Sequence, residues 1–469
     1  MSTSIKKVAF KHKLVIIGFG SIGKALLPVL FQNIDIKPSQ IIIISNRNDG
    51  LPLAKQYEIE LLIEAIQPSN LDVIAKKLNK NDFILNLSVD VSSLELMELA
   101  RKKQALYLDL STEPWKGGYK DPSLSPALRT NYALREAILR LKGSLGPTSL
   151  VTHGANPGLV SHFVKQALIN LRDDTGLKTP PPQTRQEWAA LANALNIKAI
   201  HIAEHDTQTS LNPKRVNEFR NTWSVEGFIG ESCQPAELGW GTHERNLPPQ
   251  GQRHTTGSNA AIYLERPGAS VRVRSWCPTD GPFHGFLITH AESISIADYL
   301  SLKENDLCYY RPTVHYAYLP SPDAVLSINE LQGYEWQAQK EQTLMLNEID
   351  AGSDELGVLL MGNPKGSYWY GSKLTIDEAR KIAPQNNATT LQVVAGCIAG
   401  IIWAIEHPNQ GVVEPDDIDY KYCLKIAAPY LGKVAGYYTD WTPLQNRAHL
   451  FNEDLDREDP WQFKNIHVK

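Results

Sequence analysis

The sequence predicts an α/β protein in which a doubly wound parallel sheet is followed by a second domain of the α+β class. Three observations carry this prediction. A glycine motif follows the first apolar run, short apolar strands alternate with helical patterns up to residue 155, and the chain beyond is rich in strands and turns. At 469 residues the chain is longer than one core usually supports, so we expect two or three domains.

The first predicted strand, Leu14–Ile17, runs directly into G-x-G-x-x-G at the start of a predicted helix. In this motif the first glycine permits a tight turn, the second lets the backbone approach a pyrophosphate, and the third allows close packing of helix on strand. The N–H groups of the helix's first turn also favour a diphosphate. The motif therefore predicts a Rossmann-type dinucleotide site formed by Gly18, Gly20, Ser21, Ile22 and Gly23.

Four further parallel strands are expected in this domain. They are Ile41–Ile44, Phe83–Leu87, Leu106–Leu108 and Leu150–Thr152. Helical patterns lie near Ser21–Phe31, Asn70–Leu78, Ser92–Lys102 and Tyr132–Arg140. A parallel strand that is covered on both faces reads as a continuous apolar run, and the four consecutive isoleucines from Ile41 to Ile44 do so.

The end of the second strand bears on which dinucleotide binds. Rossmann domains that bind NAD usually present Asp or Glu there, which binds the ribose 2′-hydroxyl. This chain presents Asn46 instead, with Arg47 beside it. Asn46 is therefore a candidate cofactor residue, and the position leaves both NAD and NADP open.

The second domain is expected to hold a mixed or antiparallel sheet with helices. Its predicted strands are Ala199–Ala203, Ala261–Leu264, Val271–Arg274, Gly285–His290 and Val314–Tyr318. Residues 179–182, Thr-Pro-Pro-Pro, are typical of a stiff, exposed linker. Residues 387–406 form a strongly apolar helical run that ends before Pro408, and we expect this helix to be buried against the N-terminal domain.

These patterns divide the chain into three parts. We expect a dinucleotide-binding Rossmann domain at 1–156, completed by a segment at about 385–430 that returns to it. A second domain of the α+β class is expected at 157–384, with substrate binding and dimerisation implied by the resemblance described below, and a C-terminal extension at 431–469.

Composition excludes several classes of function. A net charge of −4 provides no basic field for nucleic acid. No apolar run approaches the ~20 residues of a membrane span, and Met1–Lys13 lacks the apolar core and cleavage site of a secretory signal. The five cysteines are scattered without a C-x-x-C, which indicates reduced thiols in a cytoplasmic enzyme and no metal site.

Polar segments follow three predicted strands of the first sheet, at the edge where ligands bind in such folds. They are Asn86–Asp90, Asp109–Trp115 and His153–Gly158. Ser88 and Asp90 are candidate cofactor contacts, although Asp90 and Asp109 are equally well explained as turn formers. Glu113 and Asn156 are stronger candidates, because each precedes a proline that favours an extended conformation at a fixed bend.

Acidic and aromatic residues recur together in the second domain. The segments are His201–Asp206, Asn221–Glu226, Glu231, Glu237–Glu244, Thr289–Glu292 and Asp354-Glu355. Each residue alone is explained as solvated surface or core filler, but carboxylates and an indole face in an enclosed pocket suit a desolvated organic ammonium. His201–Asp206 alternates like a half-buried strand. His290 closes a predicted strand, where a neutral imidazole could shuttle protons or could be purely structural.

Together these segments resemble the bacterial homospermidine synthases, which are relatives of the saccharopine dehydrogenases, along nearly the whole chain. The resemblance is carried by Gly18–Gly23, Asn86–Asp90, Glu113–Trp115, Gly154–Gly158, Asn221–Phe228, Gln234–Glu244, Thr289–Asp298, Asp354–Leu360 and Tyr438–Leu444. It implies a homodimeric enzyme that makes homospermidine and ammonia from two putrescine molecules, with spermidine as a further candidate substrate. In that family NAD accepts hydride from the first amine, and the same NADH later reduces the new imine, so NAD is regenerated in each turnover.

The resemblance also implies roles for individual residues. Catalysis is expected from Glu204, Glu231, His290 and Asn156, and substrate binding from Glu113, Trp223 and Asp354, with Asp350 as a neighbouring alternative to Asp354. Cofactor contacts are expected from Gly18, Gly20, Ser21, Ile22, Gly23, Asn46, Ser88, Asp90 and Asn156. Which of Glu204, Glu231 and His290 acts as the base stays open.

Two other interpretations remain. A saccharopine-type or carboxyspermidine-type reductase needs an arginine for an α-carboxylate, and Arg272 and Arg274 are the residues that could supply it. A non-catalytic NAD-sensing protein would need only the nucleotide-binding half, which does not explain the acids, the tryptophans and His290. Putrescine is a dication without a carboxylate, so its site should hold acids and aromatic rings and no matching pair of arginines.

Overall fold

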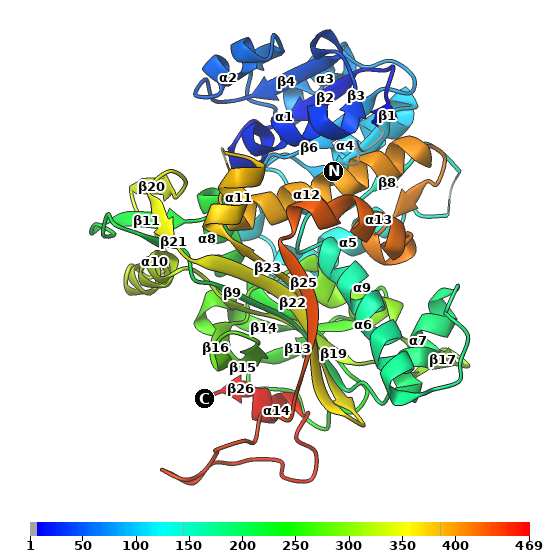
Figure 1. Cartoon of the computed structure of the whole chain (residues 1–469), viewed down its shortest axis with the longest axis vertical. Helices are drawn as coiled ribbons and strands as arrows, with labels where there is room; N and C mark the ends of the chain where they lie inside the picture. Colours follow the sequence, from blue (N-terminus) through cyan, green and yellow to red (C-terminus); the bar gives the residue numbers. More distant parts are fainter. Residues whose placement is uncertain (1–6, 144, 385) are drawn as a thin grey trace.

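The computed structural model describes residues 7–143, 145–384 and 386–469. Two sheets organise this part of the chain: a seven-stranded parallel sheet and an eleven-stranded mixed sheet (Figure 1). The predicted α/β class, with a Rossmann-type sheet and a second mixed sheet, is confirmed. The expectation about the N-terminus falls partly on residues 1–6, which lie outside the described residues.

The parallel sheet has the strand order of a doubly wound nucleotide-binding fold. The strands, in order, are β5 (Glu60–Ile63), β4 (Ile41–Ser45), β2 (Leu14–Ile17), β6 (Phe83–Asn86), β7 (Leu106–Asp109), β8 (Ser149–Leu150) and β24 (Val412–Val413). Strand order reverses between β2 and β6, and β24 joins the β8 edge from far along the chain. All five predicted strands are present within one or two residues at their ends.

Helices cover this sheet at the four predicted places and at one further place, residues 51–56, that was not predicted. They are α1 (Ser21–Asn33), α2 (Leu51–Gln56), α3 (Asp72–Ala75), α4 (Ser93–Lys103) and α5 (Asn131–Leu139). The helix expected near Asn70–Leu78 is much shorter, because Pro68–Asn70 forms a separate 3-10 turn ahead of it. α4 begins where the Ser92 hydroxyl accepts from the Glu95 N–H, and ends at Gln104 in a left-handed conformation.

The mixed sheet is built around three long buried strands. Its strand order is β13 (Gly251–Arg253), β14 (Ala261–Pro267), β12 (Pro235–Gly239), β19 (Thr313–Leu319), β9 (Ala199–Asp206), β22 (Ser353–Asn363), β23 (Gly366–Thr375) and β25 (Lys433–Thr439). Beside them pair β15 (Arg272–Cys277), β16 (Gly281–Phe286) and β26 (His467–Val468). Helices α6 (Leu159–Thr175), α9 (Ala291–Tyr299) and α12 (Ala388–Glu406) pack on one face, and β15 packs against β9 and β22.

Further helices complete this half of the molecule. They are α7 (Arg185–Ala194), α8 (Val225–Cys233), α10 (Pro322–Gly333), α11 (Ile376–Ile382), α13 (Tyr420–Ala427) and α14 (Phe463–Ile466). The proline segment 179–182 connects α6 to α7, and Pro182 is buried rather than exposed. The C-terminal residues return to the mixed sheet, where β26 pairs with β15 (Figure 1).

Two expectations about strands in this domain were wrong. β9 is buried on both faces, apart from the half-buried His205, since β15 packs against it and α6 and α12 cover the neighbouring strand β22. The strand expected at Gly285–His290 instead spans Gly281–Phe286, and His290 is the residue before α9. Leu287 and Ile288 are apolar because they are buried in the core, not because they pair in the sheet.

The apolar run at 387–406 forms helix α12, which lies between the two sheets (Figure 1). It packs on α1 and β7 of the parallel sheet and on β22 and β23 of the mixed sheet. By length and composition α12 could cross a membrane, contrary to our expectation that no run would, but 89% of its apolar window is buried inside the protein. Asn387 caps the helix by accepting from the Thr390 N–H.

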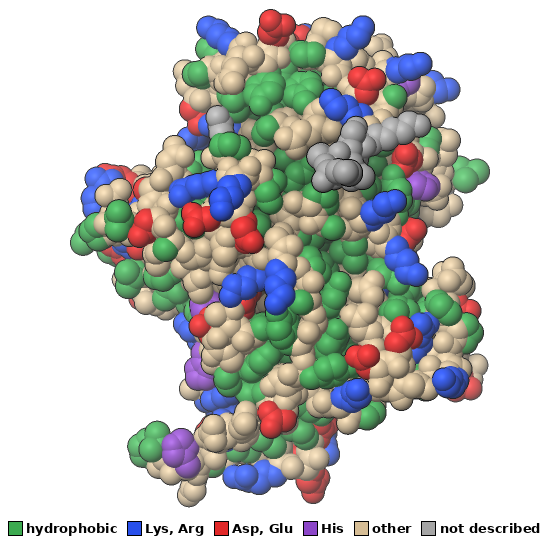
Figure 2. Space-filling model, in the orientation of Figure 1, with side chains coloured by type: hydrophobic (Ala, Val, Ile, Leu, Met, Phe, Trp, Pro, Cys, Tyr) green, Lys and Arg blue, Asp and Glu red, His purple; other side chains and the backbone are tan. Residues whose placement is uncertain are grey.

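The visible surface carries both signs of charge. Figure 2 shows acidic and basic side chains interspersed on this face, without a large area of either sign. All five cysteines are free, in agreement with the expectation of reduced thiols.

The close approach of α12 to the backbone after β8 generates a stability prediction. A Cβ at Gly396 would lie 1.9 Å from the Gly154 carbonyl oxygen, so no side chain fits without moving the helix. We expect Gly396→Ala to destabilise the protein by about 1–3 kcal/mol, even though alanine favours an isolated helix. Thermal or urea unfolding measures the difference.

Gly333→Ala is the matched control. Gly333 is likewise a helical glycine, the last residue of α10, but a Cβ there would meet no atom within 4 Å. The control should keep the stability of the wild type or gain slightly. Equal stability of the two variants would contradict the packing constraint at Gly396.

Candidate active site

The glycine motif lies between β2 and α1, at the point where the strand order of the parallel sheet reverses. Gly18 has a φ of +90°, and a Cβ there would lie 2.8 Å from the Ser88 backbone nitrogen. A Cβ at Gly20 would meet no protein atom within 4 Å. The first turn of α1 carries no acidic residue. This open backbone at a helix N-terminus fits the diphosphate of a dinucleotide.

The other candidate cofactor residues lie along the carboxyl edge of the same sheet. Asn46 directly follows β4 and is exposed. Ser88 follows β6, and its hydroxyl donates to Asn86 Oδ1 at 2.6 Å. Asp90 has a φ of +67°. Asn156 follows β8, but its amide donates to Glu204 of the mixed sheet at 2.8 Å, so it lies in the carboxylate site described below.

Asp109 has a structural role. Its carboxylate accepts from the Tyr107 hydroxyl at 2.8 Å and from the Thr152 N–H at 2.6 Å. Burial raises the pKa of Asp109 to about 6. These contacts tie the end of β7 to the loop after β8, which favours the turn-former interpretation.

A first carboxylate cluster surrounds His290. Its Nε2 lies 3.1 Å from Glu231 Oε2, and its Nδ1 lies 3.1 Å from Glu292 Oε1. Burial opposes a charge on the ring, but Glu292 and Glu231 together raise the pKa of His290 well above its usual value. This environment favours an imidazolium between two carboxylates over the neutral imidazole that the sequence analysis considered.

Glu113 lies beside this cluster, and it lines one small pocket with Glu231 and His290. Burial raises the pKa of Glu113 to about 8, against the hydrogen bond from the Ser111 hydroxyl at 2.9 Å, and the charge of Glu231 adds to the rise. At neutral pH Glu113 therefore holds a proton in the absence of a cation. Placing a cation in this pocket would favour its ionisation.

A second carboxylate cluster is formed by neighbouring strands of the mixed sheet. Asp354 on β22 lies directly opposite Asp206 on β9, and Glu204 lies two residues before Asp206 on the same face. Burial, and then the charges of Glu204 and Asp206, raise the pKa of Asp354 well above its usual value. Thr389 of α12 donates to Asp354 Oδ2 at 2.5 Å, while Asp354 Oδ1 is buried without a hydrogen-bond partner.

Glu204 is held by two donors. The Tyr316 hydroxyl donates to its Oε2 at 2.6 Å and the Asn156 amide donates to the same oxygen at 2.8 Å. Burial nevertheless raises the pKa of Glu204 to about 7. A carboxyl group that titrates near neutral pH in a fixed orientation is suited to accept and return a proton.

Aromatic rings connect the two clusters. The Tyr316 ring lies 4.5 Å from the His290 ring and stacks on Tyr318 at 5.0 Å. The Tyr318 hydroxyl accepts from Trp223 Nε1 at 3.1 Å, and Trp223 is only partly buried. The predicted residues Asn156, Glu204 and Asp354 thus lie together, and Glu113, Glu231 and His290 lie together, with Tyr316 between the two groups.

Sequence reasoning singled out the acidic segments that contain Asp206 and Glu292 but gave these two residues no role of their own. It missed Tyr316, Tyr318 and Thr389. Tyr316 and Tyr318 had a usable signal, because alternate tyrosines on a predicted strand share one face. Nothing in the sequence near Thr389 points to a partner in another domain.

The two arginines that could bind a substrate carboxylate lie outside this site. Arg272 donates to the His284 carbonyl and Arg274 donates to the His467 carbonyl. Among the residues that the structure describes, no arginine or lysine forms an ion pair with Glu113, Glu204, Glu231 or Asp354. Asp350, the alternative to Asp354, is exposed and accepts from Thr209 at 3.3 Å.

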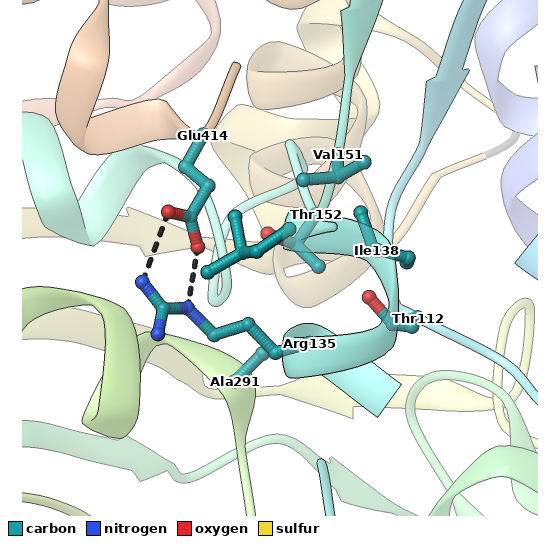
Figure 3. A pocket seen from close by; sticks show the side chains of 8 residues that line it. Thr112, Arg135, Ile138, Val151, Thr152, Ala291 and Glu414 are labelled. Carbon is teal, nitrogen blue, oxygen red and sulfur yellow. Dashed lines mark hydrogen bonds and ion pairs between the residues drawn. The ribbon is translucent and has the colours of Figure 1, made fainter. Parts of the chain in front are cut away.

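A buried ion-pair network supports the helix that follows His290. Figure 3 shows the Arg135 guanidinium of α5 on both oxygens of Glu414, at 2.6 and 3.0 Å, beside a small cavity that Thr112 and Ala291 also line. Arg135 also donates to Asp298 at 2.9 Å, near the end of α9. The network joins α9 to the segment that returns to the parallel sheet.

Comparison with known families divides the chain much as its two sheets do, except that β24 of the parallel sheet falls in the second match. The sequence model of the saccharopine dehydrogenase NADP binding domain matches residues 14–150. The model of the saccharopine dehydrogenase C-terminal domain matches residues 154–440.

Comparison with individual proteins gives similarities over nearly the full length. A homospermidine synthase from Mesorhizobium japonicum is 50% identical over 97% of this chain and 96% of its own. One from Blastochloris viridis is 50% identical over 97% of each. The crystal structure of the homospermidine synthase from Legionella pneumophila in complex with NAD is 55% identical, with a TM-score of 0.93 over 99% of both chains.

Proposed function

The chain belongs to the homospermidine synthase family, and on that premise we propose that it converts two putrescine molecules to homospermidine and ammonia with NAD as its cofactor. The observation that carries the proposal is the pair of buried carboxylate clusters without a lysine or arginine partner among the described residues. A diamine dication is the kind of ligand that such a site stabilises. An amino-acid substrate would leave its own carboxylate unpaired there.

Each cluster has a proposed task. Asp354 and Glu204 receive one ammonium group, and Glu113 and Glu231 receive the other end of the substrate. The partly exposed Trp223 presents an indole ring to an amine-bearing intermediate. Thr389 and Asn156 hold Asp354 and Glu204 in place through the hydrogen bonds described above.

Bound NAD supplies the hydride acceptor and, later in the same turnover, the hydride donor. The residues proposed to hold it are Gly18, Gly20, Ser21, Ile22, Gly23, Asn46, Ser88, Asp90 and Asn156. The open backbone at Gly20 and the acid-free first turn of α1 support this assignment. We assign Glu204 as the base that takes a proton from the substrate ammonium, because its pKa is raised to about 7.

His290 acts as a fixed positive charge in this proposal. Held between Glu231 and Glu292, it offers both carboxylates a positively charged partner beside the substrate. The nearly complete burial of His290, Glu204 and Asp354 limits the access of water, which matters because a free imine hydrolyses.

We also propose the wider organisation. The chain is divided into a NAD-binding domain at 1–156 with 385–430, a substrate domain at 157–384 and an extension at 431–469. The pairing of β24 with β8 and the packing of α12 on α1 support this division. We further propose that the protein is a homodimer in the cytoplasm and that it also accepts spermidine as a substrate. The interpretations as a saccharopine-type reductase or a NAD sensor are weaker, because Arg272 and Arg274 lie outside the site and the buried acids would have no use in a sensor.

The direct test is to incubate the purified protein with putrescine and NAD at well under one equivalent. We expect homospermidine in many-fold excess over NAD, measured by mass spectrometry, with no net rise in NADH absorbance. NADH that accumulates in step with product would indicate an ordinary dehydrogenase. If putrescine does not react but an amino acid and a 2-oxo acid are turned over, the result would favour the saccharopine-type alternative.

The Tyr316 hydrogen bond predicts a change in pH dependence. The activity limb at low pH should follow Glu204, because a protonated carboxyl cannot accept the substrate's proton. Tyr316→Phe removes a donor that lowers the pKa of Glu204, so this limb of kcat/KM should move to higher pH by about 0.5–1 unit. Tyr318→Phe keeps the hydrogen bond to Glu204 and should leave the limb in place. If the low-pH limb does not move in Tyr316→Phe, or moves equally in Tyr316→Phe and Tyr318→Phe, Glu204 is not the base.

Trp223 can be tested by separating activity from stability. A cation over an indole ring contributes ~0.5–1 kcal/mol when exposed and ~2 or more when desolvated. Trp223→Ala should therefore lower kcat/KM by about one to two orders of magnitude, and Trp223→Phe by less, both with nearly unchanged melting temperatures. Trp188→Ala, at a fully buried position, should instead lose ~3–5 kcal/mol of stability. A loss of stability in Trp223→Ala as large as that of the control would assign Trp223 to the core.

A further inference from the structure

The loop after β4 places one carboxylate between two cations beside the glycine motif. Asp49 Oδ2 lies 2.7 Å from Lys24 Nζ, and Asp49 Oδ1 lies 3.5 Å from Arg47 Nε. Lys24 is the residue after the last glycine of the motif, on α1. Arg47 also reaches Glu226 of α8 at 4.0 Å. Both cations near this edge of the sheet are therefore engaged by acids of the chain itself.

Packing fixes this loop against the motif. A Cβ at Gly50 would lie 2.2 Å from the ring of Phe19, the residue between the first two motif glycines. The Ser45 hydroxyl accepts from the Arg47 N–H at 3.2 Å, and the Leu51 N–H donates to the Asn48 carbonyl at 3.0 Å. Asp49 thus lies at a defined position next to the nucleotide-binding turn.

The location matters because this loop distinguishes the two dinucleotides in Rossmann folds. An acid at the end of the second strand binds the 2′-hydroxyl of NAD, whereas an arginine nearby accommodates the 2′-phosphate of NADP. Here the expected acid is replaced by the neutral Asn46, which cannot repel a phosphate by charge. Lys24 and Arg47 would suit a 2′-phosphate if they were free.

We propose that Asp49 is the residue that makes this chain select NAD over NADP. Its carboxylate occupies the donors of Lys24 and Arg47 and places a negative charge where a 2′-phosphate would have to enter. A phosphate monoester carries about −1.5 to −2 charges at pH 7, so it would both compete with and be repelled by Asp49. The inference rests on the proposed function in that it concerns the same dinucleotide site.

The three side chains are partly exposed, at 28% for Lys24, 45% for Asp49 and 62% for Arg47. Ion pairs of this kind contribute little to stability, so removing the charge should leave the fold intact. Salt should weaken the selection, because screening acts on exposed charges.

The test is a binding measurement on the whole chain, with NADH and NADPH titrated separately by nucleotide fluorescence. We expect the wild type to prefer NADH, and Asp49→Asn to narrow the ratio of the two dissociation constants by about tenfold or more, mainly through tighter NADPH binding. Asp49→Glu keeps the charge and should keep the preference. Glu226→Gln removes only the weaker ion pair of Arg47, so it should change the ratio of the two dissociation constants by less.

Asp72→Asn is the matched control, because Asp72 is an exposed acid of the same domain that pairs with Lys76 away from the motif. It should leave both dissociation constants unchanged. A wild type without preference, or an unchanged ratio in Asp49→Asn, would overturn the proposal. A wild type that prefers NADH but does not convert putrescine would count against the proposed function alone.

Discussion

The arrangement of the molecule depends on one packing constraint, which is that α12 must lie directly against the backbone that follows β8. Gly396 allows that approach, and the His153 ring contacts the Gly396 carbonyl at 2.9 Å. The same helix packs on α1 beside the parallel sheet and supplies Thr389 to Asp354 of the mixed sheet. One helix thus fixes the distance between the nucleotide-binding turn and the deepest carboxylate, and a hydride transfer site needs that distance to be constant.

Burying several carboxyl groups on two central strands is unfavourable, and the structure offsets the cost by protonation and hydrogen bonding instead of by basic side chains. Glu113 and Asp354 have raised pKa values, while Glu204 titrates near neutral pH. A cation that enters therefore displaces protons as it binds. Glu231 and Glu292 differ from these groups, because His290 lies between them as a basic partner.

The sequence was most informative where local chemistry determines structure. The turn at Gly18, the four isoleucines of β4 and the proline after Asn156 need no knowledge of distant partners, and the resemblance indicated which acids gather. The charge of His290 could not be predicted, because it depends on two carboxylates whose distances only the fold sets. Thr389 reaches Asp354 from 35 residues away in the chain. The extent of β16 was misjudged because an apolar run marks burial, and burial does not require pairing.

The position of β24 has a consequence for how the chain is made. This strand completes the parallel sheet at β8, yet it begins at Val412, after the whole mixed sheet except β25 and β26 has left the ribosome. Until then the edge of β8 carries unpaired backbone groups, the kind of edge that joins with other strands. The N-terminal domain therefore cannot finish folding as an independent unit during synthesis, and its last step waits until Val412–Val413 has been made.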